Sequence, residues 1–205
     1  ENLFNESIRI FKSLETLYKK YTFSITAALN YIGDTRLFSG NNAEALRLYE
    51  KCIAMSEGRR NFMSMSLFCA NAGHASFNMG NYDEAEIFFE KSLAYLNEVK
   101  GGWVHPIANS FKALLLAYEG NYEGALHNLK MADMYCERIR KKYWMGINNR
   151  VKAEIRAMMD KNENVKSRFR DYLVENAEYY ADLAIMLFNN VGYSYGASLC
   201  KKFLT

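Results

Sequence analysis

The sequence predicts an all-α fold in which antiparallel helix pairs stack into a right-handed superhelical solenoid. Pro106 is the one proline in 205 residues, which argues against an all-β fold, because β-proteins need turns at short intervals. Half of the residues are hydrophobic and 15% are aromatic, which favours a packed core over intrinsic disorder. The third observation is a helix–turn–helix pattern that recurs every 40 residues.

The pattern is centred on a Gly-Asn pair that occurs at residues 40–41, 80–81 and 120–121. Glycine readily adopts the left-handed conformation that ends a helix, and acidic residues after the pair suit the positive end of the next helix. A small residue stands seven positions before each glycine, an alanine five after it and a large apolar residue nine after it. These residues are Gly33, Ala45 and Tyr49, then Gly73, Ala85 and Phe89, then Ala113, Ala125 and Leu129.

The chain is predicted to form one array over residues 1–205. The elements in order are an additional helix over 3–20, helix pairs over about 22–58, 60–98, 103–140 and 143–174, and a partial unit over 175–205. The fourth pair is a degenerate repeat, in which Asp160 replaces the turn glycine. Its other repeated positions, seven before and five and nine after residue 160, hold Ala153, Val165 and Phe169. Gly192 is the turn glycine of the partial unit. Each pair is expected to bury its apolar stripe against the next pair.

The pattern small-x₆-Gly-Asn-Tyr-x-Glu-Ala-x₃-Phe resembles the tetratricopeptide repeat (TPR), and residues 73–93 are close to that family's consensus. The usual repeat has about 34 residues and ends in a proline, whereas this chain has a longer period and lacks the proline. Both departures fit the long-repeat branch, as in kinesin light chains, spindle-orientation adaptors and bacterial regulators of the maltose-activator type. The residues do not distinguish among these proteins.

The sequence offers no catalytic residues, no metal ligands and no cofactor motif. The patterns GxGxxG, GxxxxGK[ST], GxSxG and HExxH are absent. The four cysteines, Cys52, Cys69, Cys136 and Cys200, are too far apart in sequence for metal-ligand spacing. We expect them to be buried free thiols in the reducing cytoplasm. The chain is therefore not expected to be an enzyme.

Charge and hydropathy narrow the class of partner. The net charge of +3 is too small for the footprint of a nucleic-acid-binding domain, so direct nucleic-acid binding is not expected. No segment approaches the roughly 18 unbroken apolar residues of a membrane span. The densest basic run, residues 138–142, has three interpretations. It is helix-end charge, a docking site for an acidic partner or neighbouring domain, or a nucleic-acid contact.

The resemblance implies that the first helix of each pair lines a concave binding groove. Its predicted polar positions are Asn30, Asp34, Asn71, His74, Asn78, Ser110, Tyr118, Arg150 and Glu154. Such side chains suit capture of an extended peptide backbone, although they also fit ordinary solvated helix positions. The clamp that other tetratricopeptide arrays use for acidic chaperone tails needs Lys and Asn in the first unit, Asn in the second, and Lys and Arg in the third. Asn71 stands at the second-unit position, but the other four positions hold Asn30, Asp34, Ile107 and Phe111 in this chain, an acid and two apolar residues where cations are required. That clamp is therefore not expected.

These observations favour a non-catalytic scaffold that binds a protein or peptide segment, and a flanking domain of the same chain is one candidate partner. The chain starts without methionine inside a predicted helix, so we interpret it as part of a larger intracellular regulator, such as a transcriptional regulator. The alternative function is self-assembly through the terminal helices. That alternative relies on the apolar residues Leu183, Ile185, Met186, Phe188, Leu199, Phe203 and Leu204.

Overall fold

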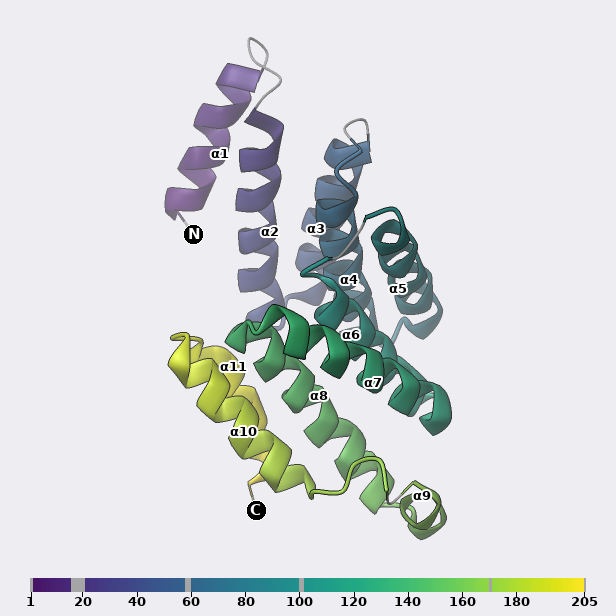
Figure 1. The fold of residues 1–205 in the computed structure, drawn as a ribbon. Coiled ribbons are helices and arrows are strands. Elements are labelled where there is room, and N and C mark those ends of the chain that lie inside the picture. The colour runs from purple at the N-terminus through teal and green to yellow at the C-terminus, as the bar shows by residue number, and fades with distance from the viewer. Residues whose placement is uncertain (1, 16–20, 58–59, 100–101, 170, 205) are drawn as a thin grey trace. The chain divides into compact units, whose positions relative to one another are not determined.

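The computed structural model describes residues 2–15, 21–57, 60–99, 102–169 and 171–204 (Figure 1). In this part of the chain every regular element is a helix, which confirms the predicted all-α fold. The elements are α1 (Asn2–Glu15), α2 (Thr22–Phe38), α3 (Asn42–Glu57), α4 (Phe62–Asn78), α5 (Tyr82–Asn97), α6 (His105–Tyr118), α7 (Tyr122–Ile139), α8 (Lys142–Asp160), α9 (Glu163–Arg168), α10 (Ala177–Asn190), α11 (Ser194–Cys200) and the 3₁₀ helix η2 (Lys201–Phe203). Residues 16–20 of the predicted first helix lie outside the described residues.

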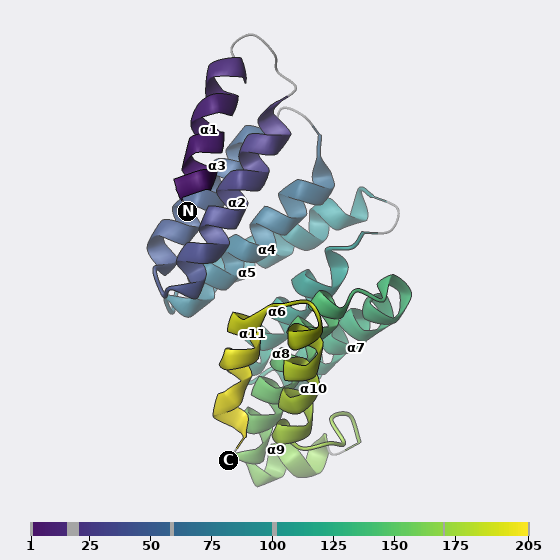
Figure 2. The same ribbon diagram turned by 90° about the vertical axis from the view of Figure 1, so that its left-hand side faces the viewer.

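The chain divides into two compact units, residues 1–102 and residues 103–205. In the first unit each helix packs against the next, from α1 through α5. In the second unit α6 packs against both α7 and α8, and α8 packs against α10. Figures 1 and 2 show the antiparallel course of neighbouring helices within each unit. Continuity of one array over the whole chain stays a prediction.

The turns between paired helices have the conformation that the repeated glycines predict. Gly40, Gly80 and Gly120 have φ values of +80°, +81° and +84°. Apart from the glycine itself and its two chain neighbours, no heavy atom lies within 4 Å of the position where a Cβ atom would stand on any of the three. Glycine is therefore required by the backbone conformation and not by lack of space. Gly192 also has a positive φ, +71°.

The small residues of the first helices make room for aromatic rings of the second helices. A Cβ atom on Gly33 would lie 2.6 Å from Cε1 of Tyr49, and one on Gly73 would lie 2.6 Å from Cε1 of Phe89. Both rings are buried. The predicted role of these positions, close approach of two antiparallel helices, is confirmed in the first unit.

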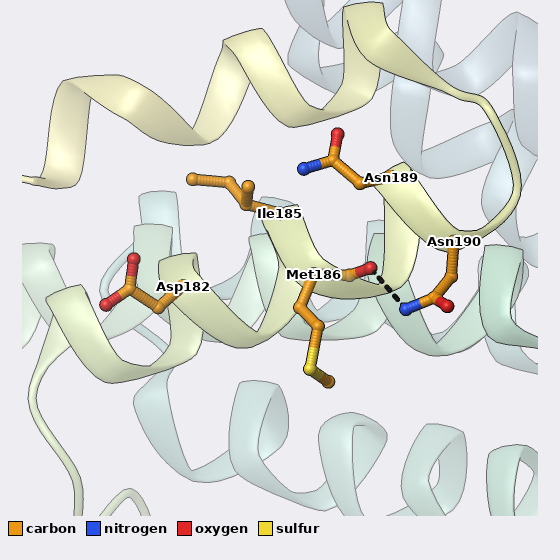
Figure 3. A pocket seen from close by; sticks show the side chains of 5 residues that line it. All are labelled: Asp182, Ile185, Met186, Asn189 and Asn190. Carbon is orange, nitrogen blue, oxygen red and sulfur yellow. Dashed lines mark hydrogen bonds between the residues drawn. The ribbon is translucent and has the colours of Figure 1, made fainter.

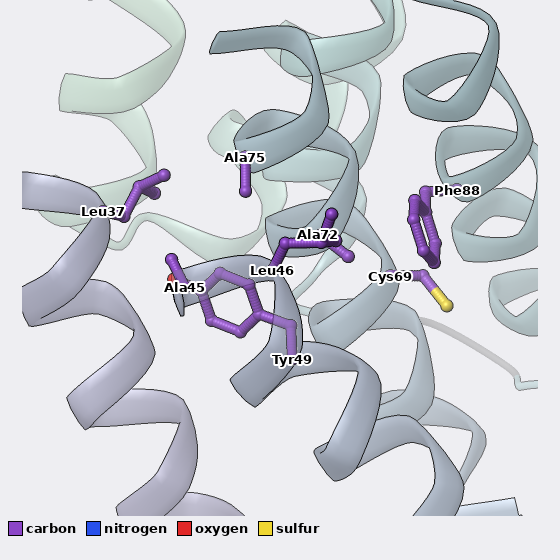
Figure 4. Close-up of a cluster of buried hydrophobic side chains, with 8 residues drawn as sticks. All are labelled: Leu37, Ala45, Leu46, Tyr49, Cys69, Ala72, Ala75 and Phe88. Carbon is purple, nitrogen blue, oxygen red and sulfur yellow. The ribbon is translucent and has the colours of Figure 1, made fainter. Parts of the chain in front are cut away.

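The core of the first unit continues from one helix pair into the next. Buried side chains from α2 to α5 form one cluster (Figure 4), which consists of Leu37, Ala45, Leu46, Tyr49, Cys69, Ala72, Ala75 and Phe88. A second cluster joins Ile8 of α1 to Ile25, Ala28, Leu29, Ile32, Cys52 and Phe68. All four cysteines are buried free thiols, as predicted. Burial raises the pKa of Cys52 and Cys69 to about 12, so both stay protonated and unreactive.

The fourth helix pair differs from the sequence-based expectation. Its predicted second helix, α9, has six residues and buries none of them, so it is too short to cover the 19-residue α8. The helix that packs along α8 is α10. A Cβ atom on Gly146 of α8 would lie 2.6 Å from Cε1 of Phe188 of α10, which repeats the glycine–aromatic contact of the first unit. Phe169, at the end of α9, is still buried.

Candidate functional site

In the first unit, the first helices α2 and α4 each present accessible side chains. Tyr31 and Thr35 of α2 and Asn78 of α4 are exposed, and His74 of α4 is half-buried. These four residues, which we call the first-helix face, lie close to one turn apart along each helix. Tyr31 is the most accessible, at 57%, and its ring stacks on Phe4 of α1 with centroids 5.8 Å apart.

A polar network lies beneath the first-helix face and joins α2, α3 and α4. Its centre is Asp34, whose Oδ1 accepts hydrogen bonds from Tyr49 Oη at 2.7 Å and from Asn71 Nδ2 at 3.3 Å. Asp34 Oδ2 accepts from Asn30 Nδ2 at 3.2 Å, and Asn30 Oδ1 accepts from Asn71 Nδ2 at 3.0 Å. The network holds the two first helices in a fixed relation. Asn30 and Asn71 are buried and take part in packing.

The pKa of Asp34 is raised from 3.8 to about 6. Desolvation raises it, and the hydrogen bond from the Tyr49 hydroxyl offsets a smaller part of that rise. Each of the three donors around this carboxylate is neutral, so none of them supplies a compensating positive charge. Asp34 is therefore ionised at neutral pH but carries a proton in mildly acidic solution. A buried network of this kind is stable when each member is bonded.

Asn71 has one hydrogen-bonding atom that no other described residue uses. Its amide nitrogen donates to both Asn30 and Asp34, so both N–H bonds are engaged. Among the described residues its carbonyl oxygen Oδ1 has no partner, yet it is not among the fully buried unpaired atoms. An acceptor held in place by two internal bonds is suited to receive an N–H group from a ligand backbone.

In the second unit the predicted groove residues do not form a comparable face. Ser110 is fully buried, and its Oγ lies 2.9 Å from Asn148 Oδ1 of α8. Arg150 is buried and donates to Glu154 at 3.1 Å. Glu154 also pairs with Lys202 of η2 at 3.3 Å. Tyr118, at the end of α6, is exposed. Ser110, Arg150 and Glu154 are thus engaged in internal contacts.

Sequence reasoning missed three polar residues that organise the second unit. Asp133 of α7 accepts from Asn148 Nδ2 of α8 at 2.6 Å and pairs with Lys152 Nζ at 2.6 Å. Together with Ser110 they link α6, α7 and α8, as the Asp34 network links α2, α3 and α4. The repeated pattern gave no signal for them, because they stand outside the repeated positions.

The remaining surface features are modest. A shallow hollow beside α10 is lined by Asp182, Ile185, Met186, Asn189 and Asn190 (Figure 3). In that hollow Asn190 Nδ2 donates back to the carbonyl oxygen of Met186 at 2.8 Å. Within the described ranges no three His, Cys, Asp or Glu side chains are grouped closely enough to hold a metal ion. None of the helices described has both the length and the apolar character needed to span a bilayer.

One stretch of the first unit matches a known protein family. It contains α4 from Phe68 onward, the Gly80 turn and most of α5. Residues 68–95 match the tetratricopeptide repeat. This TPR stretch includes Asn71 and His74 of the candidate site and the Gly73–Phe89 contact. No curated protein matches the chain. TPR stretches commonly serve as protein-interaction scaffolds, which agrees with the accessible first-helix face of the same unit.

Proposed function

We propose that this chain is a non-catalytic scaffold that holds an extended segment of a protein against the first-helix face. The observation that carries the proposal is the state of Asn71. Its amide nitrogen is fixed by two internal bonds, while its carbonyl oxygen has no partner among the residues that the structure describes. An extended segment presents N–H groups at regular intervals, and one of them can donate to this oxygen.

The chemistry of the face favours a protein segment over a highly charged polymer. Tyr31 supplies an aromatic surface, while Thr35, His74 and Asn78 supply polar groups without a strong sign of charge. Aromatic rings with few rotatable bonds contribute contact area at low entropic cost. The Asp34 network supports the face from below, so binding does not require the two helices to be ordered first.

The scaffold belongs, in this proposal, to a larger intracellular regulator in the cytoplasm, such as a transcriptional regulator of the long-repeat branch. The match at residues 68–95 supports only the repeat, and the 40-residue period is the sequence feature on which the long-repeat branch is proposed. The bound segment then comes from a partner protein or from a flanking domain of the same chain. Neither a membrane nor a nucleic acid is the proposed partner of this face.

The test is selection of peptides from a random phage-displayed library, followed by affinity measurement on variants. Tyr31→Ala removes an aromatic side chain that is 57% exposed on α2. The matched control is Ile87→Ala, which removes an apolar side chain that is 54% exposed on the second helix α5. We expect Tyr31→Ala to weaken the selected peptides about tenfold, as loss of a central aromatic contact does. Peptides that lose affinity only with Ile87→Ala would place recognition on the second helices.

Self-assembly through the C-terminal helices remains the second candidate function, and exposure of two apolar residues favours it. Met186 of α10 and Leu204 after η2 are both exposed, whereas Phe188 is buried against Gly146. An interface would therefore use the outer side of α10, beside the shallow hollow. Sedimentation velocity over a range of concentrations tests it, and a chain that stays monomeric throughout rules it out.

A further inference from the structure

At one end of the second unit, the beginnings of α6 and α8 and the end of α7 bring several aromatic side chains together. Trp103, just before α6, stacks on Trp144 in the first turn of α8, with ring centroids 5.4 Å apart and planes at 27°. Trp103 is 41% exposed. The ring of His105 lies flat on that of Tyr135 of α7, with centroids 3.8 Å apart. A solvent-accessible tryptophan supported by a second ring is unusual on a surface without a partner.

Four cations stand in the same stretch of the chain, between the end of α7 and the beginning of α8. Arg138, Arg140, Lys141 and Lys142 are all exposed. Within the described part of the chain none of the four pairs with a carboxylate, and Lys142 donates instead to the amide oxygen of Asn190 at 3.3 Å. Lys141 and Lys142 directly precede Tyr143 and Trp144 in the sequence. Burial lowers the pKa of His105, and the positive charge of Arg138 lowers it further.

Stabilisation of helix ends accounts for Arg138 but not for Lys141 and Lys142. Arg138 is in the last turn of α7, where a cation complements the negative helix end. Lys141, however, is the N-cap of α8 and Lys142 its first residue, and the first turn of α8 contains no acidic residue. Cations at a helix N-terminus oppose the helix dipole and cost stability. Residues that lower local helix stability without improving packing are expected at functional surfaces.

We propose that the aromatic–basic surface, defined as Trp103, Trp144, Arg138, Lys141 and Lys142, binds an acidic protein segment that carries one apolar or aromatic side chain. The apolar side chain packs on the exposed face of Trp103, and the flanking carboxylates pair with the cations. Tryptophan and arginine dominate binding energy at protein interfaces, and complementary charge adds specificity and speeds association. The surface lies in the second unit, so the proposal does not rest on the first-helix face.

A nucleic acid is the less favoured occupant of this surface. The cluster is short, and the whole chain has a net charge of +3, whereas nucleic-acid binders spread cations along a stripe that follows many phosphates. A short acidic segment needs only the few positive charges that are present.

The chain offers a direct readout, because its two tryptophans are Trp103 and Trp144. Intrinsic tryptophan fluorescence therefore reports on this surface alone. The probe is the synthetic peptide acetyl-Glu-Glu-Asp-Leu-Phe-Asp-Glu-Glu-amide, which contains no tryptophan. We expect a saturable change in emission whose apparent affinity falls about tenfold between about 0.05 and 0.3 M NaCl, as screening of a multiply charged contact requires.

Paired variants locate the contact. Arg138→Gln with Lys141→Gln should weaken the peptide about tenfold. The matched control, Lys161→Gln with Lys201→Gln, removes two exposed lysines elsewhere on the same unit and should leave affinity unchanged. Trp103→Ala, followed by anisotropy of a labelled peptide, should abolish measurable binding while the helical circular dichroism signal is retained.

Three outcomes overturn the proposal. The first is a fluorescence titration without saturation. The second is equal binding of a peptide in which glutamine and asparagine replace the acidic residues. The third is tighter binding of oligothymidylate than of the acidic peptide, which would make the surface a nucleic-acid contact.

Discussion

Replacement of Gly73 by alanine tests the packing principle on which the helix pairs rest. Gly73 lies in the interior of α4, where alanine is favoured over glycine by about 1 kcal/mol of helix propensity. Propensity alone therefore predicts that Gly73→Ala stabilises the protein. The added methyl group, however, would stand 2.6 Å from Cε1 and 2.7 Å from Cδ1 of Phe89. The ring of Phe89 is buried, with 1% of its surface exposed, so it must be displaced within a packed core.

The two effects can be compared in magnitude. Overpacking of a well-filled core costs about 1–3 kcal/mol, and a contact this short with a buried ring belongs near the upper end. After the gain in propensity, we expect Gly73→Ala to lower the free energy of unfolding by about 2 kcal/mol. Phe89→Leu alone should cost about 1–2 kcal/mol, because it removes part of a buried side chain.

The third repeat shows which pair of residues relieves the clash. At the positions of Gly73 and Phe89 it has Ala113 and Leu129, and both are buried. We therefore expect the double variant Gly73→Ala with Phe89→Leu to be at least as stable as Phe89→Leu alone. The coupling energy in the double-mutant cycle should then be about 2 kcal/mol. Urea titrations monitored by circular dichroism measure all four proteins. Additive effects, or a Gly73→Ala variant more stable than the parent, would refute the reasoning.

Two further predictions concern the Asp34 network. The pKa of Asp34 is raised from 3.8 to about 6 in the folded protein. The folded state therefore binds the proton more tightly than the unfolded state, and Asp34 contributes its full stabilisation below about pH 4. This stabilisation is lost as pH rises through about 6, and the loss in the free energy of unfolding is at most about 3 kcal/mol. Urea titrations across this range should show a pH slope in the parent that Asp34→Asn removes, and an unchanged slope would contradict the assignment. Asn71→Ala leaves Asn30 Oδ1 without its donor and should cost about 1–3 kcal/mol. Asn78→Ala, on the exposed side, should cost less than about 0.5 kcal/mol in the same urea titrations.

The sequence was sufficient to predict the helix pairs because their determinants are local. A turn that needs a positive φ selects glycine, and close helix approach selects a small residue at a fixed offset from it. Gly40, Gly80 and Gly120 therefore mark the turns, and Gly33 and Gly73 mark the contacts. Both requirements act within one repeat, so the spacing along the chain carries the information.

The candidate site was less predictable because its contacts join different repeats. Asn30 and Asn71 look like solvated residues in their own helices, but each is buried by its bond to the other, 41 positions away in the sequence. Trp103 and Trp144 are also 41 positions apart in the sequence, so their stacking could not be predicted from either helix alone. No pattern within a single helix distinguishes a polar residue that faces solvent from one that faces a polar residue of the next repeat.

The fourth helix pair shows how a structural rule can hold while its sequence spacing changes. In the first unit the aromatic ring that covers the glycine lies 16 residues after it, as in Gly73 and Phe89. In the second unit the ring over Gly146 is Phe188, from α10, with α9 and its flanking turns between them. If α10 is the true partner of α8, Gly146→Ala should destabilise the protein by about 2 kcal/mol, and Phe188→Leu should relieve the clash. If α9 were the partner instead, Phe188→Leu would not suppress the effect of Gly146→Ala in urea titrations, whereas a substitution at Phe169 would.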